Sequence, residues 1–208
     1  MNKTLLSYQK IIPMIIGTLL FVLLFIFVRI PSPLPETDIQ LAYGISVLYG
    51  VLYGPLVSLF ITLLGHIISD LIVFKSLWWS WIIGSAIVGV FAGIPYYTHN
   101  FKKYPKINVT LYIWNVIGQM FAWLVTAPLL DVVMYQEPKD LSFAQGSIAF
   151  GINTITGLLV GVILVNLYLV FISKKNYKKI DKNSCVIINY LVLYISKNLI
   201  KSGGGNRP

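Results

Sequence analysis

Charged side chains are scarce in this sequence. Of its 208 residues, 11% are charged and 57% are hydrophobic, and the mean hydropathy is +0.78. Soluble domains carry about 25% charged residues, so the composition excludes an ordinary soluble domain and predicts an all-α, multi-pass protein of the cell membrane. The formal net charge of +9 does not indicate a nucleic-acid partner, because in a membrane protein the basic residues report on topology.

Cysteine and histidine are also scarce, and nucleotide-binding motifs are absent. The single cysteine, Cys185, excludes an internal disulfide and a cysteine-based metal site. The only histidines are His66 and His99, and no HExxH pattern is present. The absence of a P-loop motif excludes ATP binding of that kind. Because an enzyme needs more titratable groups than the hydrophobic runs contain, we predict neither an enzyme nor a metal- or cofactor-binding protein.

Long hydrophobic runs predict six membrane-spanning helices, since about 20 apolar residues in a helix cross a bilayer. One run is too long for a single crossing, and Gly54-Pro55 marks a break in it. The predicted spans are Ile11–Ile30, 40–53, 55–71, Ser76–Tyr97, Leu111–Leu130 and Leu141–Ile172. After the first span, the sequence PSPLPETDIQ contains three prolines, which predict an extended and stiff loop.

The basic residues predict the topology of these six spans. Ten of them fall on the side of the two termini, whereas Arg29, Lys75 and Lys139 fall on the other side. By the positive-inside rule, both termini are predicted to be cytoplasmic. We interpret residues 1–180 as the six-helix membrane domain and residues 181–208 as a cytoplasmic tail, either interfacial or disordered.

A polar stripe in the fifth predicted span is the main sign of a binding site. Asn115, Gln119 and Trp123 are spaced at i, i+4 and i+8, so they share one helix face. Amides in hydrocarbon are costly without partners, so this stripe either joins helices or lines a pocket. Trp123 favours a pocket for a small planar polar ligand. Asn153 in the sixth span is predicted to lie about as deep as Asn115, and segments 31–40 and 78–81 are predicted to close the pocket from outside.

A second polar face lies on the third predicted span, where His66 and Asp70 are four residues apart. Three interpretations remain open for them: a structural pair, part of a ligand site, or a proton relay. Small residues also recur at four-residue spacing, as in Gly157 and Gly161, and this pattern is typical of close helix packing.

Several short motifs occur together in one order over residues 10–175. They are P-S-P-L-P-E-T-D-I-Q-L, L-Y-G-P-L-V, G-H-x-x-x-D, W-W-S-W, W-N-V-I-G-Q, A-P-L-x-D-x-x-x-Y-x-E-P, F-A-Q-G and I-N-T-I-T. This set resembles the S components of energy-coupling factor (ECF) transporters, and among these the riboflavin-type subfamily. The resemblance implies a six-helix subunit that binds a vitamin or related micronutrient at the outer side. It also implies partners, namely a transmembrane T subunit and two ATPases, which fits the missing P-loop.

We therefore predict the substrate-capture subunit of an ECF importer, with a membrane scaffold or assembly protein without a ligand as the alternative. The predicted substrate-binding residues are Gln40, Tyr43, His66, Asp70, Trp79, Asn115, Gln119, Trp123 and Asn153. S components commonly dock the T subunit through an alanine-rich face of the first helix, but this chain has no alanine before Ala42. Gly17 and Thr18 are the small residues in that span, and we predict that they form the docking position.

Overall fold

The computed structural model describes residues 8–32, 34, 37–98 and 109–177. The chain divides into two compact units, Met1–Leu167 and Tyr168–Pro208, and the fold and site below belong to the first. The predicted tail, residues 181–208, and the lysine-rich loop at residues 99–108 lie outside the described residues. The interpretations of these two segments therefore stay predictions.

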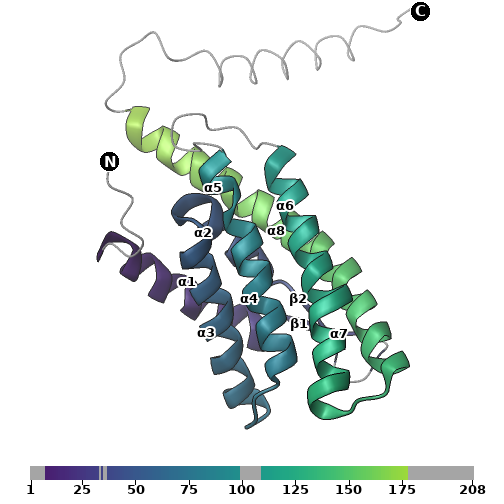
Figure 1. Cartoon of the computed structure of the whole chain (residues 1–208). Helices are drawn as coiled ribbons and strands as arrows, with labels where there is room; N and C mark the ends of the chain where they lie inside the picture. The colour runs from purple at the N-terminus through teal and green to yellow at the C-terminus, as the bar shows by residue number, and fades with distance from the viewer. Residues whose placement is uncertain (1–7, 33, 35–36, 99–108, 178–208) are drawn as a thin grey trace, which may run out of the picture. The chain divides into compact units, whose positions relative to one another are not determined.

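Helices make up nearly all of the described chain (Figure 1). The first half contains α1 (Tyr8–Phe27), β1 (Arg29–Pro31), β2 (Asp38–Gln40), α2 (Tyr43–Tyr53), α3 (Pro55–Val73), α4 (Trp79–Gly93) and α5 (Pro95–Thr98). The second half contains α6 (Val109–Met120), η1 (Phe121–Thr126), α7 (Ala127–Leu130), η2 (Asp131–Tyr135) and α8 (Lys139–Tyr177). Elements α6 to η2 form one continuous helix over Val109–Tyr135.

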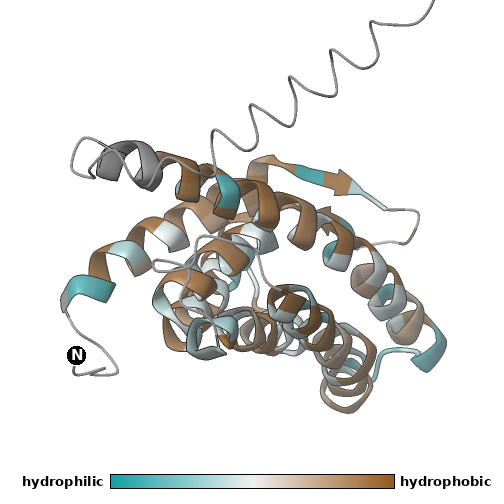
Figure 2. Ribbon diagram, turned by 90° about the horizontal axis from the view of Figure 1, so that it is seen from above, coloured by the Kyte–Doolittle hydropathy of each residue, from teal (hydrophilic) through white to brown (hydrophobic). Residues whose placement is uncertain are grey.

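Five helices of the described chain are long and apolar enough to cross a bilayer. The remaining segment, α2, has 11 residues and extends about 16 Å, roughly half of a typical hydrocarbon core. Hydrophobic residues dominate the helices (Figure 2), and outward side chains such as Leu19 and Ile155 are about 60% exposed. This pattern confirms the predicted all-α, six-helix membrane architecture, with the second helix shorter than a full crossing.

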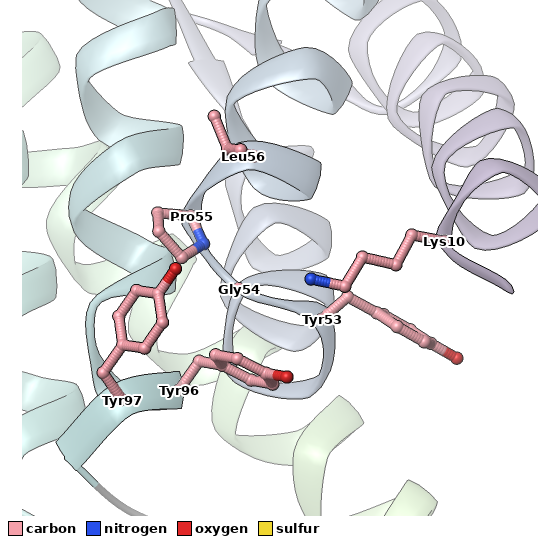
Figure 3. A pocket seen from close by; sticks show the side chains of 7 residues that line it. All are labelled: Lys10, Tyr53, Gly54, Pro55, Leu56, Tyr96 and Tyr97. Carbon is pink, nitrogen blue, oxygen red and sulfur yellow. The ribbon is translucent and has the colours of Figure 1, made fainter. Parts of the chain in front are cut away.

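The break predicted at Gly54-Pro55 is confirmed. Gly54 has a φ of 99°, in the left-handed region that favours glycine, and Pro55 is the first residue of α3. Lys10 from α1 and Tyr96 from α5 lie beside this turn and line the same small recess (Figure 3). The Lys10 ammonium lies 5.4 Å from the centre of the Tyr96 ring. The remaining recess has a volume of only about 10 Å³, so this end of the bundle is nearly closed.

The residues at the two ends of the proline-rich segment pair as strands, which the prediction of an extended loop did not include. Strands β1 and β2 are antiparallel, with Arg29 opposite Gln40 and Pro31 opposite Asp38. The guanidinium of Arg29 lies 3.4 Å from the carboxylate of Asp38. Three-residue strands are too short to show an alternating pattern, so the sequence predicted only an extended loop here.

The fifth predicted span is not a regular α-helix. Its segment η1 is π-helical, and a second π-helical segment, η2, follows directly after Leu130. A π turn holds more residues than an α turn. Pro128 follows η1 and has no amide hydrogen to donate to the preceding turn. The carbonyl oxygen of Trp123 lies instead against Gly146 of α8, where no side chain would fit. The prediction of a regular α-helix that ends at Leu130 was therefore wrong, because the helix contains a π-helical segment and continues to Tyr135.

Close helix contacts occur at the small residues, as their spacing predicted. A Cβ at Gly161 of α8 would lie 2.6 Å from the Cβ of Val47 in α2, and one at Gly50 would lie 2.6 Å from the carbonyl oxygen of Ala92 in α4. Gly89 of α4 likewise packs against the backbone of Ser58 in α3. These glycines allow helix backbones to approach closely, and they hold α2, α3, α4 and α8 together.

Candidate functional site

A cavity of about 590 Å³ lies at the end of the bundle that carries the hairpin. This volume is within the range of about 300–1,000 Å³ that is typical of small-molecule sites. Elements α1, α2, α3, α4, η1, η2 and α8 all contribute to its wall, together with β2 and the end of the hairpin. The aromatic lining residues are Phe25, Tyr43, Phe74, Trp78, Trp81 and Trp123.

Aromatic rings form one continuous side of the cavity. The rings of Trp81 and Trp123 stack at a centroid distance of 5.4 Å, and Tyr43 meets Trp123 edge-on at 5.6 Å. Tyr43 and Trp123 are each 1% exposed. Because packing from several helices fixes these rings, they present a preformed surface to a planar ligand.

Asp131 holds the tryptophan segment at the start of α4. Its carboxylate accepts hydrogen bonds from the indole nitrogens of Trp78, at 2.7 Å, and of Trp81, at 2.9 Å, and also from the hydroxyl of Ser80. The ring of Tyr135, one turn further along η2, stacks on Trp78 at 4.4 Å. The W-W-S-W motif is therefore anchored to η2, and its two indole donors are oriented by one buried carboxylate.

A hydrogen-bonded chain connects α3, α4 and α2 below this segment. Nε2 of His66 lies 3.4 Å from the carboxylate of Asp70, and Nδ1 of His66 lies 2.5 Å from the Ser85 hydroxyl. That hydroxyl is in turn 2.8 Å from the Tyr43 hydroxyl. His66 and Asp70 are thus in contact, and both line the cavity. This contact agrees with the structural-pair interpretation, and a role in ligand binding stays a prediction.

The hairpin is fixed to α8 at Gln40. The backbone nitrogen of Gln40 donates to Oδ1 of Asn153 at 3.2 Å, and the backbone carbonyl oxygen of Gln40 accepts from the hydroxyl of Thr156 at 2.9 Å. The Gln40 side chain lines the cavity and is 6% exposed, but its oxygen Oε1 has no hydrogen-bond partner. This oxygen is a buried, unpaired acceptor on a residue that lines the cavity.

Six of the nine predicted substrate-binding residues meet at this cavity. They are Gln40, Tyr43, His66, Asp70, Trp123 and Asn153. The other three, Trp79, Asn115 and Gln119, do not line it. That any of the nine binds substrate stays a prediction.

Trp79 faces away from the cavity, while its neighbours Trp78 and Trp81 line it. The Trp79 side chain is 42% exposed, and its backbone nitrogen donates to the Tyr135 hydroxyl at 2.9 Å. The choice of Trp79 among the three tryptophans was not supported by the structure. The backbone at Trp78 precedes the helix, so helical spacing could not reveal which rings point inward.

Asn115 and Gln119 lie beneath the cavity floor. Gln119 accepts a hydrogen bond from the Trp123 indole and donates to the backbone oxygen of Asn153 at 3.4 Å, so it supports two lining residues. Asn115 lies one turn deeper, near Gly157. The predicted equal depth of Asn115 and Asn153 was therefore wrong by about one helical turn, because Asn153 is level with Gln119.

Three further polar residues line the cavity and were not among the predicted substrate-binding residues, namely Asp131, Glu137 and Gln145. Asp131 lies just beyond the predicted end of the fifth span at Leu130, although it follows Trp123 by eight residues, which continues the spacing of Asn115, Gln119 and Trp123. That spacing was the available signal. Within the described ranges, no cluster of histidine, cysteine and acidic residues could hold a metal ion.

Gly17 and Thr18, the predicted docking residues, pack inside the bundle. A Cβ at Gly17 would contact the Ile61 side chain of α3 and lie 3.2 Å from the Tyr49 ring of α2. The Thr18 side chain is buried, and its hydroxyl bonds the Met14 carbonyl oxygen at 2.9 Å. The small residues of α1 therefore serve internal packing, and its outward face consists of larger side chains such as Ile15 and Leu19.

Comparison with known proteins decides the family. A family model described as "ECF-type riboflavin transporter, S component" matches residues 5–169. The chain belongs to this family. It is accordingly a substrate-specific membrane subunit of an ECF transporter, a multi-pass protein of the cell membrane, and not an enzyme. Membership implies association with T and ATPase modules and with a small-molecule substrate.

Relatives of this S component cover most of its length. A UPF0397 protein of Lactobacillus acidophilus is 34% identical over 171 residues, which span 81% of this chain and 92% of that protein. A UPF0397 protein of Streptococcus pneumoniae is also 34% identical, over 78% of this chain and 90% of that protein. One from Lactococcus lactis is 32% identical over 74% and 86%, respectively. No solved structure matches the chain.

Proposed function

We propose that this S component captures a vitamin or vitamin-like micronutrient in the cavity between the hairpin and Trp123. The observation that carries this proposal is a cavity of about 590 Å³ whose wall combines stacked aromatic rings with buried polar groups. Aromatic surface supplies affinity, and a few fixed polar groups supply orientation and specificity. The name of the matching family makes riboflavin the first substrate to test.

Energy for uptake would come from a T subunit and two ATPases, since the sequence has no P-loop. We further propose that the cavity opens to the outside of the cell. The three basic residues Arg29, Lys75 and Lys139 belong to the cavity end, and the other lysine groups belong to segments predicted to be cytoplasmic. A substrate would then enter beside the hairpin and the tryptophan segment.

The test is purification of the full chain alone, identification of any co-purifying small molecule by mass spectrometry, and calorimetric titration with riboflavin and other vitamins. We expect one vitamin to bind with one-to-one stoichiometry. In cells, uptake of that vitamin should require both this chain and functional partner ATPases. If no vitamin co-purifies or binds, the scaffold alternative is supported instead.

A further inference from the structure

The charges on the cavity wall are unbalanced. One guanidinium, from Arg29, faces four carboxylates, from Asp38, Asp70, Asp131 and Glu137. Arg29 pairs with Asp38 at 3.4 Å, and His66 pairs with Asp70 at 3.4 Å. In the described part of the chain, no cationic side chain lies within ion-pair distance of the other two carboxylates.

Asp131 makes this imbalance energetically important. Its side chain is 1% exposed, and the three hydrogen bonds that it accepts come from two indoles and a hydroxyl, all neutral donors. A buried carboxylate without a cation is costly in a low-dielectric interior. A positively charged ligand in the adjacent cavity would offset that cost.

Two further features favour a cation that carries hydrogen-bond donors. The stacked rings of Trp81 and Trp123 border the same space, and aromatic faces attract cations through their quadrupole. Independently, Oε1 of the buried Gln40 side chain is an unpaired acceptor in the cavity wall. Among the described residues, the wall therefore offers negative charge and aromatic faces beside a buried acceptor without a partner, and the one permanent cation that lines it, Arg29, is already paired.

We propose that the cavity selects a planar heteroaromatic ligand with a positive charge, over neutral or anionic ligands of similar size. This inference rests on the proposed substrate-capture function and narrows the class of substrate. A phosphorylated ligand is disfavoured by the same charges, because phosphate would face the carboxylates of Asp131 and Glu137 without a free cation.

The test compares ligands that differ in charge and little in shape. Thiamine carries a fixed positive charge on its thiazolium ring, and deazathiamine is its neutral analogue. Riboflavin and its monophosphate add a neutral and an anionic planar ligand. We expect the full chain in detergent or nanodiscs to bind thiamine about 5- to 30-fold more tightly than deazathiamine, which corresponds to about 1–2 kcal/mol from the positive charge.

Variants then test whether the carboxylates of the cavity wall cause the preference for the positively charged ligand. In Asp131→Asn the ratio of thiamine to deazathiamine affinity should fall to near one. In Glu137→Gln it should fall by about threefold, as expected for a partly exposed charge. Asp140→Asn removes a carboxylate that does not line the cavity and should keep the ratio. This ratio is informative even if a variant is less stable, because both ligands depend equally on cavity shape.

The outcomes separate this inference from the proposed function. Tighter binding of deazathiamine, riboflavin or its monophosphate than of thiamine would overturn the charge preference and leave substrate capture standing. An unchanged ratio in both Asp131→Asn and Glu137→Gln would overturn the assignment to these carboxylates. Failure of every vitamin to bind would overturn both proposals.

Discussion

Helices α3 and α4 pack against each other differently at their two ends, through backbone contacts at one end and through side chains at the other. At the Gly54 turn, Gly89 and Gly93 of α4 touch the backbone of α3, and the nearby recess holds only about 10 Å³ (Figure 3). At the hairpin end, both helices contribute residues to the wall of a cavity of about 590 Å³. Contact there is made through side chains, as between His66 and Ser85 at 2.5 Å.

This difference indicates a division of labour along the helices. Backbone-to-backbone packing at the closed end needs no polar groups and leaves little freedom, so it fixes the spacing of the helices. The open end is then held by hydrogen bonds of buried polar residues, such as Asp131 and Asn153, which remain in contact with the cavity. We expect changes at the closed end to alter stability and changes at the open end to alter binding.

The largest effect is expected at the closed end, from Gly89→Ala. A Cβ at this position would lie 2.6 Å from the carbonyl oxygen of Ser58. Overpacking of this kind costs about 1–3 kcal/mol, so we expect a lower Tm in detergent and a lower yield of monodisperse protein. Because the contact is with backbone, a change of side-chain rotamer cannot relieve it.

The matched control is Gly151→Ala on α8, where a Cβ would meet nothing within 4 Å. Alanine is favoured over glycine in a helix by about 1 kcal/mol, so the Tm of this variant should be unchanged or higher. Equal Tm values for the two variants would contradict the view that glycine contacts clamp the closed end.

The second effect is expected at the open end, from Asn153→Leu. This change leaves the Gln40 amide nitrogen without its partner at 3.2 Å and removes an amide from the cavity wall. Loss of a buried hydrogen bond costs about 1–3 kcal/mol, which corresponds to roughly 5- to 150-fold weaker substrate binding if the hairpin or the ligand depends on it.

The neighbouring residue Thr154 provides the control, because it does not line the cavity and its buried hydroxyl has no partner. Thr154→Val should keep wild-type affinity in the same calorimetric titration. If Asn153→Leu lowers Tm but not affinity, its amide only holds the hairpin.

Regular helical segments were predictable from the sequence, and so were most of the residues that these segments contribute to the cavity wall. The break at Gly54-Pro55 follows from backbone chemistry, and the polar face with His66 and Asp70 follows from α-helical spacing. Both lie in segments with ordinary helix geometry. Prediction worked there because each residue's direction depends only on its neighbours in the chain.

Features that depend on non-local contacts were not predictable. The orientation of Trp78 is set by Asp131, 53 residues away, and the hairpin is set by pairing of residues across a proline-rich loop. The π-helical geometry around Pro128 shifts residues relative to a 3.6-residue period. Equal depth on two antiparallel helices also requires a register that neither helix encodes alone, which explains the misplacement of Asn115.

A third and smaller effect is expected from Trp123→Leu, which tests the aromatic side of the cavity at the open end. The change removes the ring that stacks on Trp81 and contacts Tyr43. Aromatic contacts are worth about 0.5–1.5 kcal/mol beyond their buried area, so we expect about tenfold weaker substrate binding. Trp79→Leu, at an exposed position outside the lining, should bind like the wild type. An equal loss in both variants would place the aromatic side of the site elsewhere.

The smallest effect on binding is expected from Asn115→Leu, which tests where the open end stops. Asn115 is 2% exposed, yet neither Oδ1 nor Nδ2 has a hydrogen-bond partner, and the residue does not line the cavity. An unpaired buried amide costs about 1–3 kcal/mol, and leucine has a similar volume without that cost. We therefore expect a rise in Tm of at least about 2 °C and a substrate affinity within about twofold of wild type. Calorimetry beside thermal unfolding without ligand measures both quantities. A large loss of affinity with unchanged Tm would instead show that the substrate reaches Asn115, one turn below Gln119, and that the floor of the site lies deeper than Trp123.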